Sequence, residues 1–257
     1  MFARRDVLKG VAGASLAGLP LATILADPGL ARAAASGLHE YTIQTPAGRR
    51  VNGALAMPQG VPAPTVLLIH EWWGLNDQIK AVAAEFGRLG YLAVAVDLMD
   101  GKLAATPDEA RSLAGAVAPG EAIDTLVGWI EWLRVHDACN RRIGTVGWGF
   151  GGGWSLAASV ATPVEATVVY YGRVNRTADE LARLKGPVLG HFATRDKFID
   201  GPIVSSWEAE MKKAGKEFTT YWYDADHAFA NPTSASYDDS NAKLAWDRSL
   251  QFLETNL

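Results

Sequence analysis

The sequence predicts a single α/β domain, with a mostly parallel central sheet and helices on both faces. Strand-like and helix-like segments alternate from residue 34 onward, which implies crossover connections between parallel strands. Apolar runs such as Thr65–Ile69 are continuous rather than alternating, as in strands that are buried on both faces. The chain of 257 residues contains no linker, repeat or low-complexity tract that would divide it into two domains.

The expected domain opens with a β-hairpin and continues with two buried strands. Tyr41–Thr45 and Arg50–Met57 are strand-like runs that flank the turn sequence Pro46-Ala47-Gly48. Thr65–Ile69 and Tyr91–Val96 are the next two strands.

Two helices are predicted in this half by their capping residues. The first begins after Asn76 and ends at Gly90, because Asn favours the N-cap and Gly the C-terminal end. Its apolar positions recur at helical spacing and are Ile79, Val82, Ala83 and Phe86. Thr106 is expected to cap the second helix, with Pro107 at the first helical position.

The second half of the chain repeats the alternation as far as the C-terminus. One helix carries Leu126, Ile130 and Leu133 on a single face. Four strand-like runs follow, at Arg142–Trp148, Glu165–Tyr171, Pro187–Phe192 and Phe218–Tyr223. A helix ending at Gly215 separates the last two strands, and a C-terminal helix carries Trp246, Leu250 and Leu253.

The first 33 residues have the pattern of a signal peptide. Arg4 and Arg5 precede an apolar segment from Val11 to about Ala26, and small residues cluster at Ala31-Arg32-Ala33. A basic start, an apolar stretch and an A-x-A site are typical of secretory leaders, and paired arginines favour the twin-arginine route. A membrane anchor is the alternative, but the stretch is shorter than the roughly 20 residues that a spanning helix needs. We therefore expect export to the periplasm and a mature domain of residues 34–257.

Composition excludes several classes of function. A net charge of −4 gives no reason to expect nucleic acid or an anionic membrane as a partner. The one cysteine, Cys139, rules out a disulfide framework within the chain and any site built from several cysteines. No metal ion or cofactor is predicted.

A glycine-rich turn follows the strand Arg142–Trp148. Gly147-Trp148-Gly149-Phe150-Gly151 has the sequence of a nucleophile elbow, in which the middle residue sits on a sharp strand-to-helix turn and attacks a carbonyl carbon. That residue is Gly149, which has no side chain. The backbone of the turn is expected to persist, because glycine accepts a positive φ with little penalty.

Three more reactive side chains follow strands, where sites in parallel sheets lie. Glu71 follows Thr65–Ile69, Asp196 follows Pro187–Phe192, and His227 follows the last strand. The chain order of elbow, acid and histidine is that of α/β-hydrolases. Each residue also has a structural interpretation: a loop histidine, a helix-capping or turn aspartate, and a solvated glutamate.

Four motifs resemble those of the dienelactone hydrolase family, and the resemblance covers essentially the whole mature chain. They are LLIHEWWGLND, GWGFGGGWSL, GHFATRDKFI and YDADHAFAN, which begin at Leu67, Gly147, Gly190 and Tyr223. The resemblance implies an α/β-hydrolase domain that acts on lactones or esters without a cofactor. It also implies a Cys-His-Asp triad with a glutamate near the thiol.

Carried over by position, the acid of the triad is Asp196, the base is His227 and the extra carboxylate is Glu71. The cysteine of the family falls on Gly149. By analogy, the oxyanion hole is formed by the N–H of Phe150 and a donor near Trp72. Aromatic residues at the strand ends are expected to line the substrate pocket, and they are Trp73, Trp148, Tyr171 and Phe229.

Other nucleophiles and histidines are expected to be structural. Cys139 precedes its strand and lies roughly 20 Å from the elbow at ~3.3 Å per strand residue. Ser155 lies in the helix after the elbow and should point away from the site. His70 and His191 also end strands, but neither has the acid-then-base order of a catalytic imidazole.

Three functions remain open on the sequence. In the first alternative, the protein is a noncatalytic periplasmic binding protein for a small ester, lactone or carboxylate. Alternatively, it hydrolyses such compounds through a water that His227 activates in the space left by the missing side chain. In the third alternative, Gly149 is an engineered or erroneous change in an active lactone or ester hydrolase. No oligomeric state is predicted.

Overall fold

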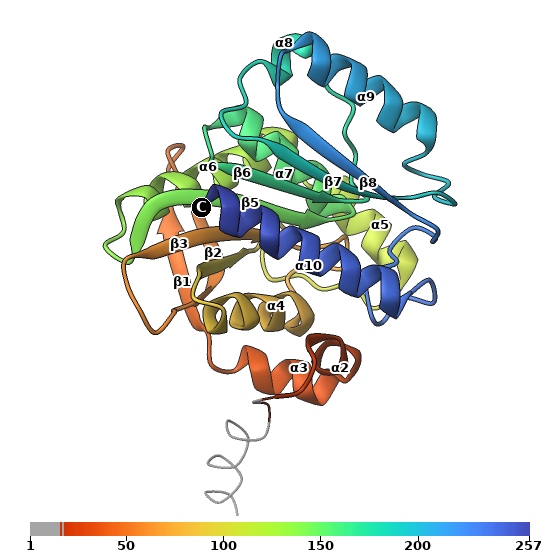
Figure 1. The fold of residues 1–257 in the computed structure, drawn as a ribbon. Helices are drawn as coiled ribbons and strands as arrows, with labels where there is room; N and C mark the ends of the chain where they lie inside the picture. The colour runs from red at the N-terminus through yellow and green to blue at the C-terminus, as the bar shows by residue number, and fades with distance from the viewer. Residues whose placement is uncertain (1–15, 17) are drawn as a thin grey trace, which may run out of the picture.

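The computed structural model describes Leu16 and residues 18–257. The twin arginines and the start of the apolar segment lie outside these residues. Within them, eight strands form one sheet in the order β1-β2-β4-β3-β5-β6-β7-β8 (Figure 1). The strands are β1 (His39–Gln44), β2 (Arg50–Ala56), β3 (Ala63–Ile69), β4 (Leu92–Val96), β5 (Cys139–Trp148), β6 (Ala166–Tyr170), β7 (Val188–Ala193) and β8 (Phe218–Tyr223).

The sheet is parallel from β4 to β8 and antiparallel at one edge. β1 pairs with β2 and β2 pairs with β4 in antiparallel register, whereas β3 pairs in parallel with both β4 and β5. β6, β7 and β8 continue the parallel pairing to the other edge. The predicted α/β class and the opening hairpin are therefore confirmed.

Helices connect the strands and follow the predicted caps. They are α4 (Asp77–Arg88), α5 (Pro107–Ala116), α6 (Pro119–Val135), α7 (Phe150–Ala161), α8 (Ala178–Leu181), α9 (Gly201–Lys213) and α10 (Asp239–Asn256). Asn76 accepts a hydrogen bond from the N–H of Ile79 at the start of α4. Thr106 and Glu109 form a capping box at the start of α5.

The helices divide into two layers. α4 and α10 cover one face, where β-strand residues such as Val66 and Val168 pack against Phe86 of α4 and Leu253 of α10 in one core. α6, α7 and α9 cover the other face, with Trp129 and Trp207 fully buried there. Burial of these apolar faces is the main stabilising contribution, at about 25 cal/mol per Å² of apolar surface.

Two short helices at the N-terminal side lie against α4. They are α2 (Leu21–Ala26) and α3 (Pro28–Ala35), and Asp27 caps α3 by accepting from the N–H groups of Gly29 and Leu30 (Figure 1). Ala31 is fully buried, and Arg32 forms an ion pair with Asp77 at the start of α4. The expected cleavage site after Ala33 thus falls within helix α3. No helix among the described residues is long and apolar enough to cross a membrane.

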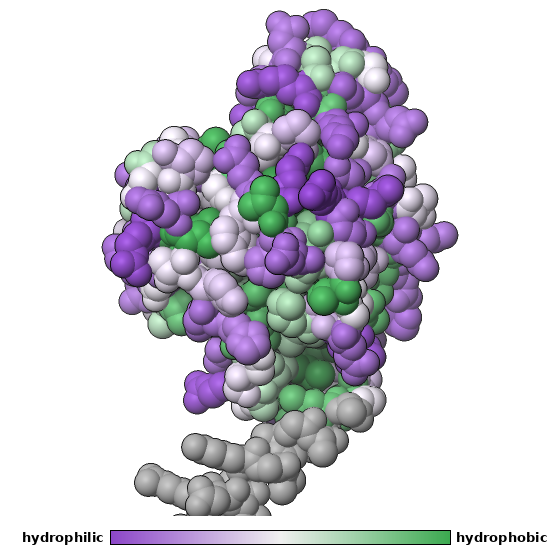
Figure 2. All heavy atoms as spheres, turned by 90° about the vertical axis from the view of Figure 1, so that its left-hand side faces the viewer, coloured by the Kyte–Doolittle hydropathy of each residue, from purple (hydrophilic) through white to green (hydrophobic). Residues whose placement is uncertain are grey.

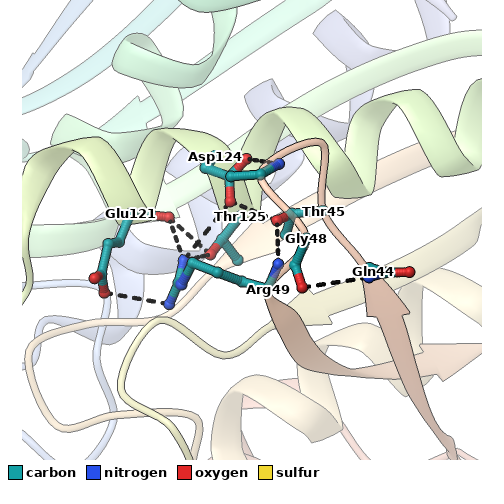
Figure 3. Close-up of polar contacts among 8 residues, drawn as sticks. Gln44, Thr45, Gly48, Arg49, Glu121, Asp124 and Thr125 are labelled. Atoms are coloured by element: carbon teal, nitrogen blue, oxygen red, sulfur yellow. Dashed lines mark hydrogen bonds and ion pairs between the residues drawn. The ribbon is translucent and has the colours of Figure 1, made fainter.

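The turn between β1 and β2 is tied to α6 by a cluster of polar side chains (Figure 3). Asp124 accepts from the hydroxyl of Thr45 and from the N–H of Ala47 at 3.0 Å. Arg49 donates to the backbone oxygen of Glu121 at 2.9 Å and to the hydroxyl of Thr125 at 3.1 Å. We call this set the hairpin cluster, and it fixes the antiparallel edge of the sheet to the helix layer.

Candidate active site

Four loops at the carboxyl ends of parallel strands bring the predicted site residues together. Glu71 follows β3 and Gly149 follows β5, and these two strands are neighbours. Asp196 follows β7 and His227 follows β8, which are also neighbours. Because parallel strands end at the same edge of the sheet, the four positions share one rim.

Asp196 and His227 form a hydrogen-bonded pair. His227 Nδ1 lies 2.6 Å from Asp196 Oδ2, and the second oxygen of Asp196 accepts from the N–H groups of Phe198 and Ile199. Burial by itself would raise the pKa of Asp196, but the hydrogen bonds from His227, Ile199 and Phe198 together lower it below its ordinary value. The carboxylate therefore stays ionised, holds the proton on Nδ1 and leaves Nε2 as the acceptor nitrogen.

Asp196 also has part of the structural role of a turn or helix-capping aspartate. It closes the turn after β7, but the N-cap of α9 is Asp200, which accepts from the N–H of Ile203. The turn orients Asp196 so that one oxygen is left for the histidine.

Gly149 has the backbone of a nucleophile elbow. Its φ of 52° and ψ of −112° lie in a region that residues with a Cβ rarely adopt, and it is the N-cap of α7. A Cβ built on Gly149 would lie 3.9 Å from His227 Nε2 and 3.9 Å from the ring of Tyr171, so nothing blocks a side chain there. By contrast, a Cβ on Gly151 would lie 2.1 Å from the backbone oxygen of Ile69, so α7 can approach β3 only because Gly151 is a glycine.

Tyr171 approaches this position from the end of β6. Its φ of 38° is unusual for a bulky residue, and conformations of this kind gather at functional sites. The ring meets His227 edge-on at a centroid distance of 5.2 Å, and its hydroxyl donates to Glu71 at 3.3 Å. Tyr171 thereby links the base to the second carboxylate.

Glu71 is held in a fixed orientation inside the site. Asn231 donates to Oε2 at 2.6 Å, and Tyr171 donates to Oε1. Burial raises the pKa of Glu71, and Asn231, the nearby His227 and Tyr171 offset part of that increase. The solvated-loop interpretation does not describe this carboxylate, because both of its oxygens have protein donors.

Phe150, one of the two residues expected to provide oxyanion donors, directly follows Gly149. Phe150 is the first residue of α7, so its N–H has no acceptor within the helix and points out of the helix N-terminus. The aromatic ring of Phe150 stacks on His70 at 6.0 Å, which ties the start of α7 to the turn that carries Trp72. The positive end of the helix dipole favours negative charge at this point.

A cavity of about 680 Å³ adjoins the site on the α4 and α10 side of the sheet. Two of the four aromatic residues expected in the pocket line it, Trp148 and Tyr171, together with Glu71 and Asn231. Phe229 is fully buried against Tyr171 and Tyr223, so it supports the wall from behind. Trp73 packs edge-on against Trp72 and does not line this cavity.

The residues expected to be structural occupy core positions. Cys139 is buried at the far end of β5, and Ser155 hydrogen-bonds to Thr145 and to the backbone oxygen of Val168. His70 and His191 are fully buried, and each has both ring nitrogens within hydrogen-bond distance of protein atoms.

Two residues of the site escaped the sequence analysis. Asn231 lies four positions after His227, inside a quoted motif, and its role as donor to Glu71 depends on the fold of the loop between them. Phe198 meets the imidazole of His227 edge-on, with ring centroids 5.3 Å apart and 72% of the residue exposed. The only feature of the sequence that could have indicated Asn231 and Phe198 is their closeness in the chain to His227 and Asp196, respectively. In the described residues, no cluster of three or more His, Cys, Asp or Glu side chains has the geometry to hold a metal ion.

Comparison with known proteins finds relatives and solved structures that match most of the chain. A putative carboxymethylenebutenolidase from Saccharolobus solfataricus is 28% identical over 244 residues, which cover 80% of this chain and 94% of the relative. The carboxymethylenebutenolidase of Pseudomonas putida is 27% identical over 223 residues, 82% of this chain and 94% of that protein. A putative dienelactone hydrolase from Klebsiella pneumoniae shares the fold with a TM-score of 0.75 and 24% identity, over 85% of this chain and 99% of that structure.

The sequence model of the dienelactone hydrolase family matches residues 51–257. That range contains the strand-end loops of β3, β5, β7 and β8, and with them every residue of the site described above. The predicted family and the α/β-hydrolase fold are thereby confirmed, and the chain belongs to the dienelactone hydrolase family.

Proposed function

We propose that the protein hydrolyses carboxylic esters or lactones by direct attack of a water molecule that His227 activates. The observation that carries the proposal is the position of His227 Nε2, 3.9 Å from where a Cβ of residue 149 would lie. An imidazole oriented by Asp196 and aimed at an open elbow is the arrangement that a general base needs. The names of the relatives and of the family support hydrolysis as the class of reaction.

The reaction proceeds without a covalent intermediate. Nε2 of His227 removes a proton from water while the water oxygen bonds to the carbonyl carbon of the substrate. The carbonyl oxygen becomes an oxyanion, which the N–H of Phe150 at the start of α7 stabilises. Collapse breaks the bond to the leaving oxygen, and the imidazolium of His227 returns the proton to that oxygen. The products are a carboxylic acid and an alcohol, or a hydroxy acid from a lactone.

Asp196 and Glu71 have different parts in this scheme. Asp196 stabilises the imidazolium that forms on His227, because it stays ionised and bonds directly to Nδ1. Glu71 fixes Tyr171 and Asn231 at the inner side of the elbow. The expected rate is low: serine proteases that lack a triad member keep roughly 10³–10⁴-fold catalysis over water, which is the scale of rate that remains without a nucleophile.

A binding protein on the same scaffold is the second candidate. The glycine at the elbow favours it, because the chain has no side chain there to form an acyl-enzyme. A cavity of about 680 Å³ is also within the size range of small-molecule sites. This candidate predicts saturable binding of an ester, lactone or carboxylate without turnover.

The test is hydrolysis of p-nitrophenyl acetate by the full-length chain and by His227→Ala. We expect the parent to be slow but measurable, and His227→Ala to lose at least about 100-fold of the rate above buffer, the scale of general-base catalysis. His39→Ala is the matched control, because His39 is exposed on β1, far along the sheet from the site. A parent that is no faster than His227→Ala would refute hydrolysis and favour the binding protein.

A further inference from the structure

The N-terminal segment, which lies outside the range matched by the family, forms one wall of the cavity beside the site. Leu19, Leu21, Ala22 and Leu25 contribute to its lining from α2 and the residues before it. α4 and α10 provide the facing walls, which agrees with the position of α2 and α3 beside α4 in Figure 1. Gln78 of α4 holds the segment in place by donating to the backbone oxygen of Leu25 at 2.7 Å.

The inner end of the cavity borders the site through shared residues, although Gly149 and His227 themselves do not line it. Tyr171 and Trp148 line the cavity and also border the elbow, since Tyr171 contacts His227 and Trp148 directly precedes Gly149. Glu71 and Asn231 stand at the same end. A ligand with its carbonyl carbon at Gly149 could therefore extend past Tyr171 into the cavity.

The walls are apolar along most of their length. The apolar and aromatic residues that line the cavity are Leu21, Leu25, Ile79, Val82, Trp148 and Trp246. Figure 2 shows hydrophobic side chains gathered at the lower end of the molecule, at the height of α2 and α3, on a surface that is otherwise largely polar.

Charged residues at the rim neutralise one another. Arg88 pairs with Glu85 at 2.6 Å, and Lys243 pairs with Asp247 at 2.6 Å. Each of these two cations has its own carboxylate, and the remaining carboxylates of the lining accept from neutral donors, Asp239 from the Tyr237 hydroxyl and Glu71 from Tyr171 and Asn231. The lining therefore fits a hydrocarbon chain better than a second charged group of a ligand.

We propose that this cavity binds the apolar acyl chain of a carboxylic ester or acid, with the carboxyl group at Gly149 and His227 and the chain packed against the segment Leu19–Leu25. The rates measured in the test below rest on the proposed hydrolysis, whereas the measurements of ligand binding do not. The proposed site requires residues 19–25, so it is an alternative to the predicted cleavage after Ala33, which would remove this wall.

The test is calorimetric binding of octanoate and acetate to the full-length protein and to three alanine-to-tryptophan variants. Ala22→Trp and Ala242→Trp fill the cavity from opposite walls, at positions that are only partly buried. Ala26→Trp is the matched control, because Ala26 is exposed on α2 and does not line the cavity. We expect both cavity variants to weaken octanoate binding at least tenfold, with Ala26→Trp unchanged and acetate, which lacks the chain, unaffected.

Absence of saturable octanoate binding, or equal binding by Ala22→Trp, Ala242→Trp and Ala26→Trp, would overturn the proposal. Rates of hydrolysis of p-nitrophenyl octanoate and p-nitrophenyl acetate distinguish a failure of the cavity assignment from a failure of the proposed function. Octanoate binding without turnover keeps the cavity assignment and refutes hydrolysis. Turnover that is independent of chain length, with no octanoate binding, refutes the cavity assignment and keeps hydrolysis.

Discussion

The hairpin cluster and the active site are both polar groups packed against a helix, but they differ in what is left unbonded. In the hairpin cluster, Asp124 bonds to Thr45 and Ala47, and Arg49 bonds to α6 (Figure 3). In the site, the carboxylates are equally engaged, yet no group among the described residues bonds to Nε2 of His227.

The difference separates a structural role from a chemical one. Bonding every donor and acceptor makes a polar cluster rigid and stabilises the fold, because unpaired buried groups cost about 1–3 kcal/mol each. The site has the same rigidity around its carboxylates, and it presents one basic nitrogen to the elbow. Polar residues of the same kinds thus stabilise a turn in the hairpin cluster and orient the general base in the active site.

The largest expected effect is that of Gly149→Cys, which supplies the thiol that the site can orient. The Cβ would have ordinary contacts at 3.9 Å, within reach of His227 Nε2 for its Sγ. Ester hydrolysis should rise by a factor on the order of 10³ as an acyl-enzyme route becomes available. A burst of p-nitrophenol equal to the enzyme concentration would identify the acyl-enzyme.

Gly149→Ala is the matched control, because it adds the Cβ without a nucleophile. It should not raise the rate. A gain shared by both variants would show that the effect comes from the backbone rather than from the thiol. No gain in a folded Gly149→Cys would contradict the assignment of His227 as a base for this position.

Asp124→Ala is expected to have the reverse effect to Gly149→Cys. It should lower the stability of the fold while leaving the rate of ester hydrolysis unchanged. The change removes the acceptor for Thr45 and Ala47, so the hydroxyl of the buried Thr45 keeps only the bond that it accepts from the N–H of Arg49 and has no acceptor for its own proton. The free energy of unfolding should fall by about 2 kcal/mol, in the range for hydrogen bonds to charged groups. Urea denaturation measures it, with the exposed Asp108→Ala as the control. A loss of turnover at equal foldedness would place the hairpin cluster among the functional residues.

The smallest effect is the loss of stability expected in mild acid. Its pH dependence distinguishes the buried His191 from the site residue His227 as the source of that loss. Burial lowers the pKa of His191 to about 3, from 6.5 in the unfolded chain. Between these values the unfolded chain binds a proton that the folded protein does not, so stability is full above pH 6.5 and is lost as the pH falls toward 3. At pH 5.5 the loss from His191 is on the order of 1 kcal/mol, and the buried His70, whose pKa is also lowered by burial, adds to it. Urea denaturation at pH 7.5 and 5.5 measures it, and His227→Ala should show the same decrease. A decrease that disappears in His227→Ala would assign the sensitivity to the site instead.

Much of the fold could be predicted from the sequence because its strands are short, apolar and bounded by turn residues. The positions of Glu71, Asp196 and His227 at strand ends followed from the same pattern, since parallel strands bring their carboxyl ends to one rim. The start of β5 was placed too late, at Arg142 instead of Cys139, because its first residues are polar and pair with Ala63 only in the folded sheet.

The contacts within the site could not be predicted, because they depend on tertiary structure. Nothing in the sequence indicates that Asn231 would turn back toward Glu71, or that Tyr171 would adopt a positive φ beside the elbow. The packing of α2 and α3 on α4 was also missed. Their apolar residues match a leader segment as well as a core, and pattern alone does not show which partner they meet.

The backbone of Gly149 also bears on the thermal stability of the protein. Any residue with a Cβ would be strained at a φ of 52°, at a cost of order 1–3 kcal/mol. The chain as it stands avoids that cost, so its melting temperature should lie a few degrees above that of the same scaffold with a nucleophile installed, at roughly 2–4 °C per kcal/mol. At this position, thermal stability and covalent reactivity cannot both be at their maximum.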